Sequence, residues 1–474
     1  MNHPTALKFG VQCVLVALLI GFALSMRAQS AKDALDEYLQ SQAADQRVPG
    51  LVFVRVDTDS RADVRTYGEG ITPETRFYIG SLSKAVTAVA VLQLVDAGLV
   101  DLDAPVRSYI PTFTTQDAER AERITVRHLL NQTSGLSDRG YVRDDSETDL
   151  AALTAGLASA RHTAEPGTSF AYFNSNYDVL GRLIEVVSGQ SYADYLQANV
   201  FDPLGMSDAL AQAPAPSAVE RLAQGHILPF SFPVAYPPQV VAAPSGGILV
   251  SGRDMGAFLR LFLQDEPTVL SSASRRLMVS LPSGLETEYG MGWFVRQLDD
   301  GTLIYEHSGD VPTFHADMMI LPEEEMAFAL LYNRQHLLSA FTSFLQIRYG
   351  VAAILRGEEP QGGLSAGVLG ALILTAALVV TFRDLRRLFL SCQWALQARI
   401  HFRPAAAIDL AELLIPAVTL LVLPTLILVL TGRALGSYGL LFALLPDVML
   451  LLFVSVVLSL LTLIVRVLLL MRGA

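Results

Sequence analysis

The chain has 474 residues, 51% of them apolar, and a formal net charge of −12 at pH 7. This length and apolar content predict a soluble part joined to membrane segments. The negative charge and the lack of a basic run argue against nucleic acid as a partner. Cys13 and Cys392 both lie outside the long middle region, which therefore has no disulfide, thiolate nucleophile or cysteine metal cluster. With no HxxxH pair among the eight histidines, we expect neither a metal nor another cofactor.

Residues 1–30 predict an export signal. A basic start precedes an apolar run from Val14 to Leu24, and the small residues Ala28 and Ser30 offer a cleavage site. An uncleaved N-terminal anchor is the alternative, because Arg27 beside the cut site is unusual.

The apolar run Phe77–Leu94 contains Ser81 and Lys84, three residues apart. On an α-helix this spacing places both side chains on one face, where the amine can take the hydroxyl proton of a serine nucleophile. The alternative is a solvated lysine on a surface helix. However, the chain has 34 basic residues and uses lysine only at positions 8, 32 and 84. Arginine cannot be deprotonated in a protein, whereas a desolvated lysine can be neutral, so the pattern favours Lys84 as a base.

Residues 31–350 predict one globular domain of the α+β class. Strands are expected near both of its ends, with helices between them. The expected strands are Val52–Val56, Arg65–Tyr67, Ile304–His307, Ala316–Leu321 and Met326–Tyr332. This order predicts an antiparallel sheet flanked by helices and closed by the two ends of the domain.

The stretch His226–Pro244 contains five prolines together with Phe230, Phe232 and Tyr236. Two interpretations remain open for it. It is either a plain surface loop or a wall beside the substrate cleft.

After a linker at residues 351–363, the composition predicts a membrane domain over residues 364–474. Three segments lack charged residues and are long enough to cross the hydrocarbon of a bilayer. These expected spans are residues 364–382, 413–432 and 448–465. Pro416, Pro424 and Asp447 could shape a site, although such residues more often mark kinks and interfaces.

Arginines set the expected orientation of this membrane domain. The loop between the first two spans holds five of them, from Arg383 to Arg403, against Asp384. Positively charged loops stay in the cytoplasm, which places residues 31–360 on the outer side, in agreement with the export signal. We therefore expect a multi-pass protein of the bacterial inner membrane whose catalytic domain faces the periplasm or exterior.

Further motifs complete the chemistry. Phe170–Tyr177 places a phenol, Tyr172, two residues before the amide of Asn174, and His307–Asp310 follows an expected strand. Together with Ser81 and Lys84 this pattern resembles the serine hydrolases of the class C β-lactamase and penicillin-binding-protein group, peptidase family S12. The resemblance covers roughly residues 35–347 and extends to Gly98–Val106, Ile124–Leu136 and Pro203–Met206.

The resemblance implies a β-lactamase/transpeptidase-like fold with a helical subdomain, and a role for each motif residue. Ser81 corresponds to the acylated serine, Lys84 to its base partner, and Tyr172 to the phenol that relays protons to the leaving group and then activates water. Asn174 corresponds to the amide that holds the substrate carbonyl. The backbone N–H groups of Ser81 and Asp310 correspond to the oxyanion hole.

The motif at residues 307–310 departs from the β-lactamases in one place. His307 stands where they carry lysine and is more similar to the peptidases and esterases of the family, which puts efficient β-lactam hydrolysis in doubt. Gly309 would let a substrate backbone approach. The other histidines with no partner visible in the sequence are expected to be structural: His128, His162, His226 and His315.

These observations predict a membrane-anchored serine hydrolase that acts through an acyl-enzyme on peptide or amide bonds, including bonds beside a D-residue. One alternative is an esterase with the same catalytic residues. Another is a catalytically silent receptor for peptidoglycan fragments or β-lactams. The plan of an exported hydrolase followed by three spans is similar to that of membrane-bound prodrug peptidases of the colibactin-maturing type. The expected partners are a small peptide, amide or ester substrate and the lipid bilayer.

Overall fold

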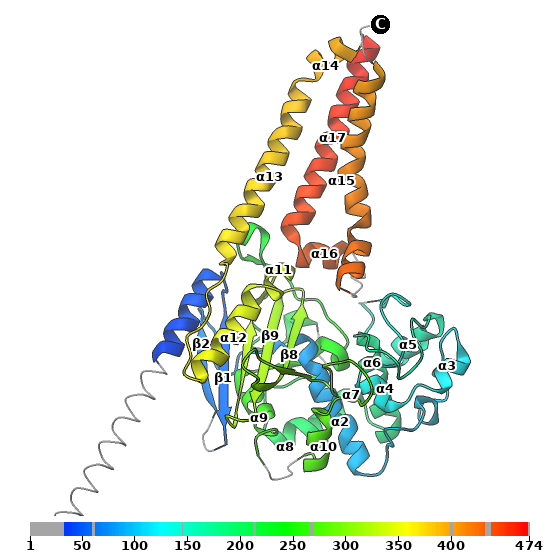
Figure 1. Cartoon of the computed structure of the whole chain (residues 1–474), viewed down its shortest axis with the longest axis vertical. Helices are drawn as coiled ribbons and strands as arrows, with labels where there is room; N and C mark the ends of the chain where they lie inside the picture. The colour runs from blue at the N-terminus through cyan, green and yellow to red at the C-terminus, as the bar shows by residue number, and fades with distance from the viewer. Residues whose placement is uncertain are drawn as a thin grey trace, which may run out of the picture.

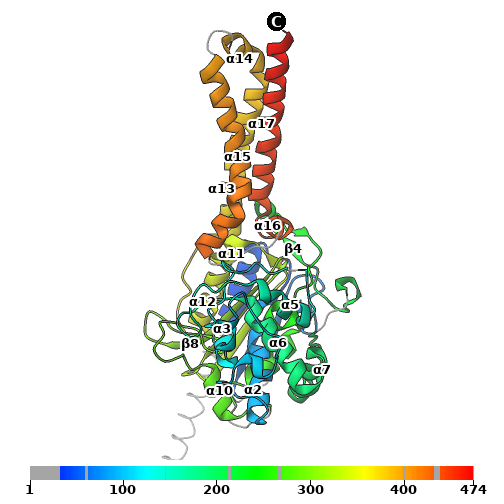
Figure 2. The same cartoon turned by 90° about the vertical axis from the view of Figure 1, so that its right-hand side faces the viewer.

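An α+β part and a bundle of long helices make up the protein (Figure 1). The computed structural model describes residues 33–58, 62–144, 146–211, 215–264, 269–398, 402–431 and 438–472. The expected export signal at residues 1–30 lies outside them. The long helices stand together at one end of the α+β part (Figure 2).

An antiparallel sheet of six strands forms the centre of the α+β part, in the order β2-β1-β10-β9-β8-β7. Its strands are β1 (Leu51–Asp57), β2 (Asp63–Tyr67), β7 (Phe294–Gln297), β8 (Leu303–Val311), β9 (Phe314–Leu321) and β10 (Met326–Tyr332). The N-terminal hairpin joins the C-terminal strands, since Val54 pairs with Val64 on one side and Ala329 on the other. The predicted sheet is confirmed. The short strand β7 was not expected, because its few residues show no clear alternation of polar and apolar side chains.

The two faces of the sheet carry separate hydrophobic cores because side chains alternate along each strand. The helices on these faces are α2 (Ser83–Asp96), α9 (Gly252–Arg260), α12 (Ser343–Leu355) and a helix over residues 33–45. Val52 and Val54 share one core with α2 and α9. Leu51 and Phe53 share the other with α12 and the helix over residues 33–45.

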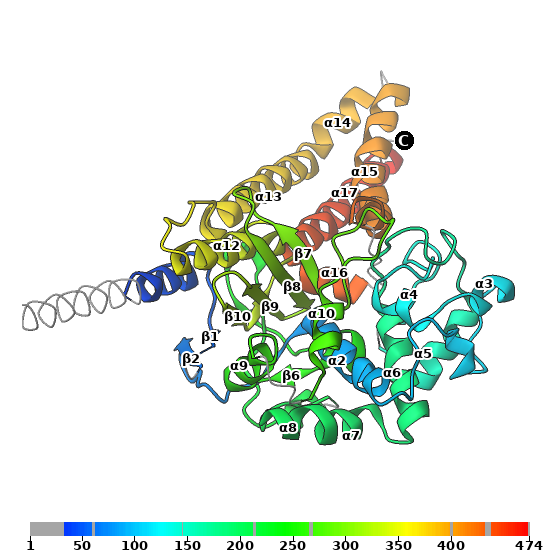
Figure 3. The ribbon, with the colours of Figure 1, turned by 60° about the horizontal axis from the view of Figure 1, so that its bottom comes forward.

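Helix α2 is the element from which the site is built. It lies between the sheet and a group of short helices (Figure 3), and Lys84 and Thr87 within it are fully buried. This group consists of α3 (Ala118–Glu122), α4 (Val126–Leu130), α5 (Leu150–Gly156) and α7 (Tyr192–Leu196), together with the longer α6 (Asn174–Ser188). The α+β part also contains α8 (Asp202–Leu204) and α10 (Ser272–Met278). Because apolar neighbours surround α2 on every side, it shows no amphipathic stripe.

The proline-rich stretch 226–244 is partly ordered by a second, small sheet. This sheet joins β11 (Arg334–Gln335), β4 (His226–Ile227) and β5 (Val234–Ala235), with the turn η6 (Pro229–Ser231) between the last two. The hydroxyl of Ser231 donates to the carbonyl of Ala366, at the start of the first long helix. The middle of the stretch therefore contacts the first of the long helices, while its last residue, Pro244, accepts a hydrogen bond from Thr87 of α2.

Within the described residues, four helical segments are long and apolar enough to cross a membrane, one more than the sequence predicted after residue 30. They are Leu337–Leu355, Ala366–Phe389, Leu410–Leu428 and Pro446–Met471. The first was not predicted as a span. It contains α11 (Leu337–Ala340) and α12, and half of its apolar window is buried, since Phe344, Ile347 and Val351 pack under the sheet. The apolar side chains of this segment therefore form part of the hydrophobic core of the α+β part.

The other long helices are α13 (Ala366–Phe389), α15 (Phe402–Thr431) and α17 (Pro446–Arg472), joined by α14 (Ser391–Ala398) and α16 (Tyr438–Leu444). Each extends beyond its predicted span at the arginine-rich end. Helix α17 packs against both α13 and α15. The outward face of α13 is apolar, because Leu378, Val379 and Phe382 are 61%, 63% and 70% exposed. Side chains of this kind suit contact with lipid rather than water.

Candidate active site

Ser81 lies in a tight turn pressed against the strand β8. The turn, η1 (Gly80–Leu82), leads directly into α2 and begins at a left-handed residue, because Gly80 has a φ of +53°. A Cβ at Gly80 would lie 2.5 Å from the backbone nitrogen of Asp310, and one at Gly309 would lie 2.8 Å from that of Ser81. Two facing glycines therefore bring the backbone N–H groups of Ser81 and Asp310 close together.

Lys84 is buried directly behind Ser81. Its side chain has no exposed surface, so the alternative of a solvated surface lysine is excluded. The Nζ atom lies 3.1 Å from the Oγ of Ser81, 2.8 Å from the Oδ1 of Asn174 and 2.6 Å from the carbonyl oxygen of Ser245. These acceptors orient the amine toward the serine hydroxyl, at a distance that permits proton transfer.

Tyr172 and Asn174 reach the site from the start of α6. The Nζ of Lys84 lies 4.9 Å from the centroid of the Tyr172 ring, and Asn174 is the first residue of the helix. Gln132 holds this segment in place, because its Oε1 accepts hydrogen bonds from the backbone N–H of Phe173 and the Nδ2 of Asn176. Gln132 has a φ of +59°, which is rare outside glycine. The segment Ile124–Leu136, through Gln132, therefore helps to position Tyr172 and Asn174.

His307 lies in an aromatic pocket beside Tyr172. The side chain is 1% exposed, and its ring centroid is 6.1 Å from that of Tyr172. The Nδ1 lies 2.7 Å from the carbonyl oxygen of Ser308, and because a carbonyl can only accept, Nδ1 carries the proton. The hydroxyl of Tyr289 lies 3.4 Å from Nε2. Burial raises the pKa of Tyr289 well above its usual value, so Tyr289 stays protonated and donates.

The side chain of Asp310 points away from Ser81 into a buried polar cluster. Its Oδ1 lies 2.7 Å from the Nδ1 of His315, whose Nε2 lies 3.0 Å from the Oδ2 of Asp317. Burial lowers the pKa of His315, but the carboxylates of Asp317 and Asp310 outweigh burial and raise it to about 9. Arg348 of α12 donates to Asp317 at 2.9 Å. The backbone nitrogen of Asp310 thus lies beside Gly80 while its side chain is held by this cluster.

Three site residues were not expected from the sequence. Ser245 gives its carbonyl to Lys84, and its hydroxyl accepts a hydrogen bond at 3.0 Å from Arg143. Arg143 forms a buried ion pair with Asp178 at 2.8 Å. The turn η7 (Ala243–Gly247) that carries Ser245 is therefore held from two sides, by Lys84 and by Arg143. The run Pro-Ser-Gly-Gly at residues 244–247 was a turn signal, but nothing in the sequence links it to Lys84.

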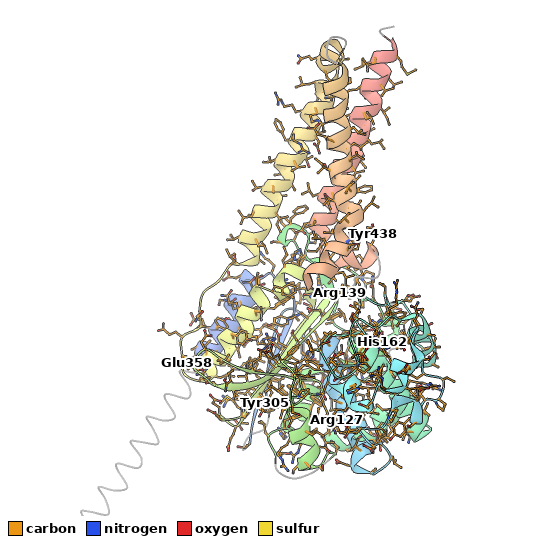
Figure 4. All side chains as sticks on the ribbon, turned by 45° about the vertical axis from the view of Figure 1, so that its right-hand side comes forward. Arg127, Arg139, His162, Tyr305, Glu358 and Tyr438 are labelled. Carbon is orange, nitrogen blue, oxygen red and sulfur yellow. The ribbon has the colours of Figure 1, made fainter. Side chains whose placement is uncertain are left out.

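The histidines expected to be structural make framework contacts. His128 closes a capping box with Thr125 at the start of α4, and the Nδ1 of His226 lies 3.1 Å from the carbonyl of Asn333. His162, labelled in Figure 4, lies 3.0 Å from the hydroxyl of Thr115. No group of three or more His, Cys, Asp or Glu side chains within the described part of the chain is arranged to hold a metal ion.

Comparisons with known proteins find similar chains over the α+β part. The family model described as Beta-lactamase matches residues 35–348. Penicillin-binding protein 4 of Amycolatopsis lactamdurans is 31% identical over 348 residues, which cover 68% of this chain and 91% of that protein. Protein flp of Staphylococcus aureus (strain N315) is 26% identical over 332 residues, which cover 66% of this chain but only 65% of that relative.

Solved structures show the same fold. The octameric penicillin-binding protein homologue from Pyrococcus abyssi superposes with a TM-score of 0.59 at 26% identity, over 70% of this chain and 79% of that chain. SurE superposes with a TM-score of 0.60 at 24% identity, over 71% of this chain and 78% of that chain. The likeness to SurE is one of fold alone.

Proposed function

Because the chain belongs to the Beta-lactamase family, we propose that it is a membrane-anchored serine hydrolase that cleaves amide or peptide bonds through an acyl-enzyme on Ser81. One observation carries the proposal. The buried amine of Lys84 lies 3.1 Å from the hydroxyl of Ser81, which is the contact that makes a serine nucleophilic.

Acylation follows from the positions of these groups. The Oγ of Ser81 attacks the substrate carbonyl carbon while its proton passes to the neutral amine of Lys84. The carbonyl oxygen becomes an oxyanion between the backbone N–H groups of Ser81 and Asp310, which stabilise its charge. Tyr172, beside Lys84, then delivers a proton to the leaving nitrogen, the C–N bond breaks, and the acyl group remains on Ser81.

Deacylation repeats the same steps with water as the nucleophile. Tyr172 and Lys84 take a proton from the water as it attacks the ester carbonyl, and the N–H groups of Ser81 and Asp310 again stabilise the oxyanion. The ester bond breaks, and the Ser81 oxygen recovers its proton from the same pair. This use of Tyr172 in both steps argues against a silent receptor, which would need no group to activate water.

The proposed substrate is a small acyl amide or peptide, including one with a D-residue beside the cleaved bond. Asn174 would hold the substrate carbonyl with its side-chain amide. His307 replaces the permanent positive charge of lysine with a ring enclosed by Tyr172 and Tyr289, so the site has less attraction for a substrate carboxylate at this point. This feature favours peptides and esters over β-lactams, and an esterase with the same residues is the second candidate.

In the proposed topology α13, α15 and α17 cross the bacterial inner membrane, and the α+β part lies on the periplasmic or outer side. Arginines gather at one end of this bundle, where Arg383 pairs with Asp384 and Arg387 with Glu412. The α+β part lies at the opposite end (Figures 1 and 2). An arginine-rich end in the cytoplasm therefore places Ser81 outside.

Mass spectrometry of the purified protein tests the function. The protein is exposed to a library of N-acyl D-amino-acid amides, their L-counterparts, acyl esters and β-lactams. We expect an acyl adduct on the peptide that contains Ser81, and turnover of the amides. Ser81→Ala should remove both. Ser83→Ala is the matched control, because the buried Ser83 hydroxyl accepts from the backbone of Ile248 and has no role in the chemistry. An adduct on another serine, or hydrolysis by the Ser81→Ala variant, would contradict the proposal.

A further inference from the structure

A buried segment joins the proposed active site to the membrane domain. It consists of β11 (Arg334–Gln335) and the next residue, His336, whose exposed fractions are 0%, 0% and 3%. Figure 1 shows α17 beginning beside α11, which directly follows this segment. The segment pairs with β4 in the small sheet and also contacts β9.

Gln335 contacts the proposed oxyanion-hole residue. Its Nε2 donates to the Oδ1 of Asp310, the same oxygen that lies 2.7 Å from the Nδ1 of His315. The Oε1 of Gln335 accepts a hydrogen bond at 3.0 Å from the backbone N–H of His336. Both the oxygen and the nitrogen of the Gln335 side-chain amide therefore form hydrogen bonds. A shift of the His336 backbone would move this amide and so change its hydrogen bond to Asp310.

His336 contacts the membrane domain. Its Nε2 lies 3.2 Å from the Oδ1 of Asp447, the second residue of α17, and the two side chains are 3% and 2% exposed. A carboxylate buried at the end of an apolar helix is costly unless it is paired. Asp447 therefore ties the start of α17 to the α+β part through His336.

We propose that Asp447 is a positioning residue for the oxyanion hole, acting through His336 and Gln335 on Asp310. This inference rests on the proposed function, because it assigns a role to the backbone N–H of Asp310. The contacts run in an unbroken order from Asp447 to His336, Gln335 and Asp310. The membrane helix α17 is thus part of the structure that sets the catalytic geometry, in addition to anchoring it.

The expected effect follows from the sensitivity of oxyanion stabilisation to distance. Removing one oxyanion donor outright costs about 10²- to 10³-fold in kcat. Loss of Asp447 displaces the Asp310 N–H without removing it, so Asp447→Ala should lower kcat by about tenfold. Substrate contacts at Asn174 are unchanged, and KM should therefore change by less than about twofold.

A matched pair of substrates reports on the oxyanion hole itself. An oxygen ester and its thionoester differ only in the carbonyl atom, and backbone N–H donors stabilise a developing O⁻ better than the larger S⁻. The full-length protein in detergent micelles should prefer the oxygen ester strongly. Asp447→Ala should lower this preference, whereas partial unfolding would lower both rates equally. Ser455→Ala is the matched control, because the buried Ser455 of α17 contacts Asp384 of α13 at 2.7 Å and does not touch β11.

Each outcome is decisive. A reduced oxygen-to-sulfur ratio in Asp447→Ala but not in Ser455→Ala supports the inference. An unchanged ratio in folded Asp447→Ala overturns it, even if kcat falls. If Asp447→Ala does not yield folded protein, Gln335→Met makes the same test from the other end of these contacts, with the same expected result. A wild-type protein that hydrolyses neither ester, or a Ser81→Ala variant that still does, would instead refute the proposed function.

Discussion

Gly80 and Asp310 approach so closely that a methyl group on Gly80 would lie 2.5 Å from the backbone nitrogen of Asp310. Gly80→Ala should therefore push the proposed oxyanion donor away from Ser81 and lower kcat by at least about tenfold. The left-handed φ adds a cost of about 1–2 kcal/mol in stability. Steady-state kinetics and thermal melting measure the two effects separately.

Gly98→Ala is the control for this variant. Gly98 has a φ of +69°, but nothing lies within 4 Å of the position its Cβ would take. The substitution should lose only the stability that the left-handed φ costs, without the added clash at Gly80, and should leave activity unchanged. Equal activity in the two variants would show that the contact with Asp310 does not matter for catalysis.

The Lys84→Arg variant tests whether Lys84 acts as a base or contributes only a positive charge. Arginine keeps the charge but has no lone pair to accept the Ser81 proton. The acylation rate should fall by about two to four orders of magnitude. Melting temperature and resistance to proteolysis must first show that the variant folds, because the guanidinium enters a fully buried site. If folded Lys84→Arg protein keeps more than about a tenth of the wild-type acylation rate, Lys84 is not the base, because loss of a base should leave a much lower rate.

Cys392 tests the orientation of the membrane domain. It lies in α14, at the arginine-rich end of the bundle, and is exposed. In intact cells a membrane-impermeant maleimide should fail to label it until the membrane is permeabilised. Labelling in sealed cells would place the catalytic part in the cytoplasm. A cysteine at Leu99, which is 56% exposed on the α+β part, should show the opposite behaviour in a Cys392→Ser background.

The buried His315 predicts how stability depends on pH. Its pKa in the folded protein is about 9, above the usual 6.5, because the carboxylates of Asp317 and Asp310 outweigh the effect of burial. The stabilisation is therefore fully present below about pH 6.5 and is lost as pH rises through about 9. The melting temperature should fall across this range, and His315→Gln should flatten the decrease. The rings of Tyr332 and Phe344 pack against His315, and Arg348 shares the Asp317 carboxylate with it. A melting temperature independent of pH in the wild-type protein would contradict this assignment.

Local patterns in the sequence predicted much of the fold, and the three-residue spacing of Ser81 and Lys84 predicted their contact. The resemblance to a known family, rather than any local spacing, indicated that Tyr172 and Asn174 join them, and both do lie beside Lys84. The contacts of Ser245 and Asp447 were not predictable in the same way. Each joins segments more than a hundred residues apart, and no local periodicity encodes such a meeting. The segment that contains α12 is apolar enough to cross a membrane although it was not predicted as a span, because a helix under a sheet and a helix in lipid are both apolar.

In the proposed topology the α+β part is exported, and helix α12 raises a problem for this export that its sequence also addresses. Its apolar segment ends at Leu355, shortly before α13 begins at Ala366, so the secretion channel meets two hydrophobic segments in succession. Arg348 lies in the first of them and costs about 2.5–3.5 kcal/mol for insertion at the centre of a bilayer. In the folded protein the same guanidinium pairs with Asp317 and Glu306. Arg348→Leu should therefore cause the α12 segment to insert into the membrane in some chains and invert their topology, which protease protection can measure. On this account Arg348 both keeps the segment out of the membrane during synthesis and packs it in the folded protein.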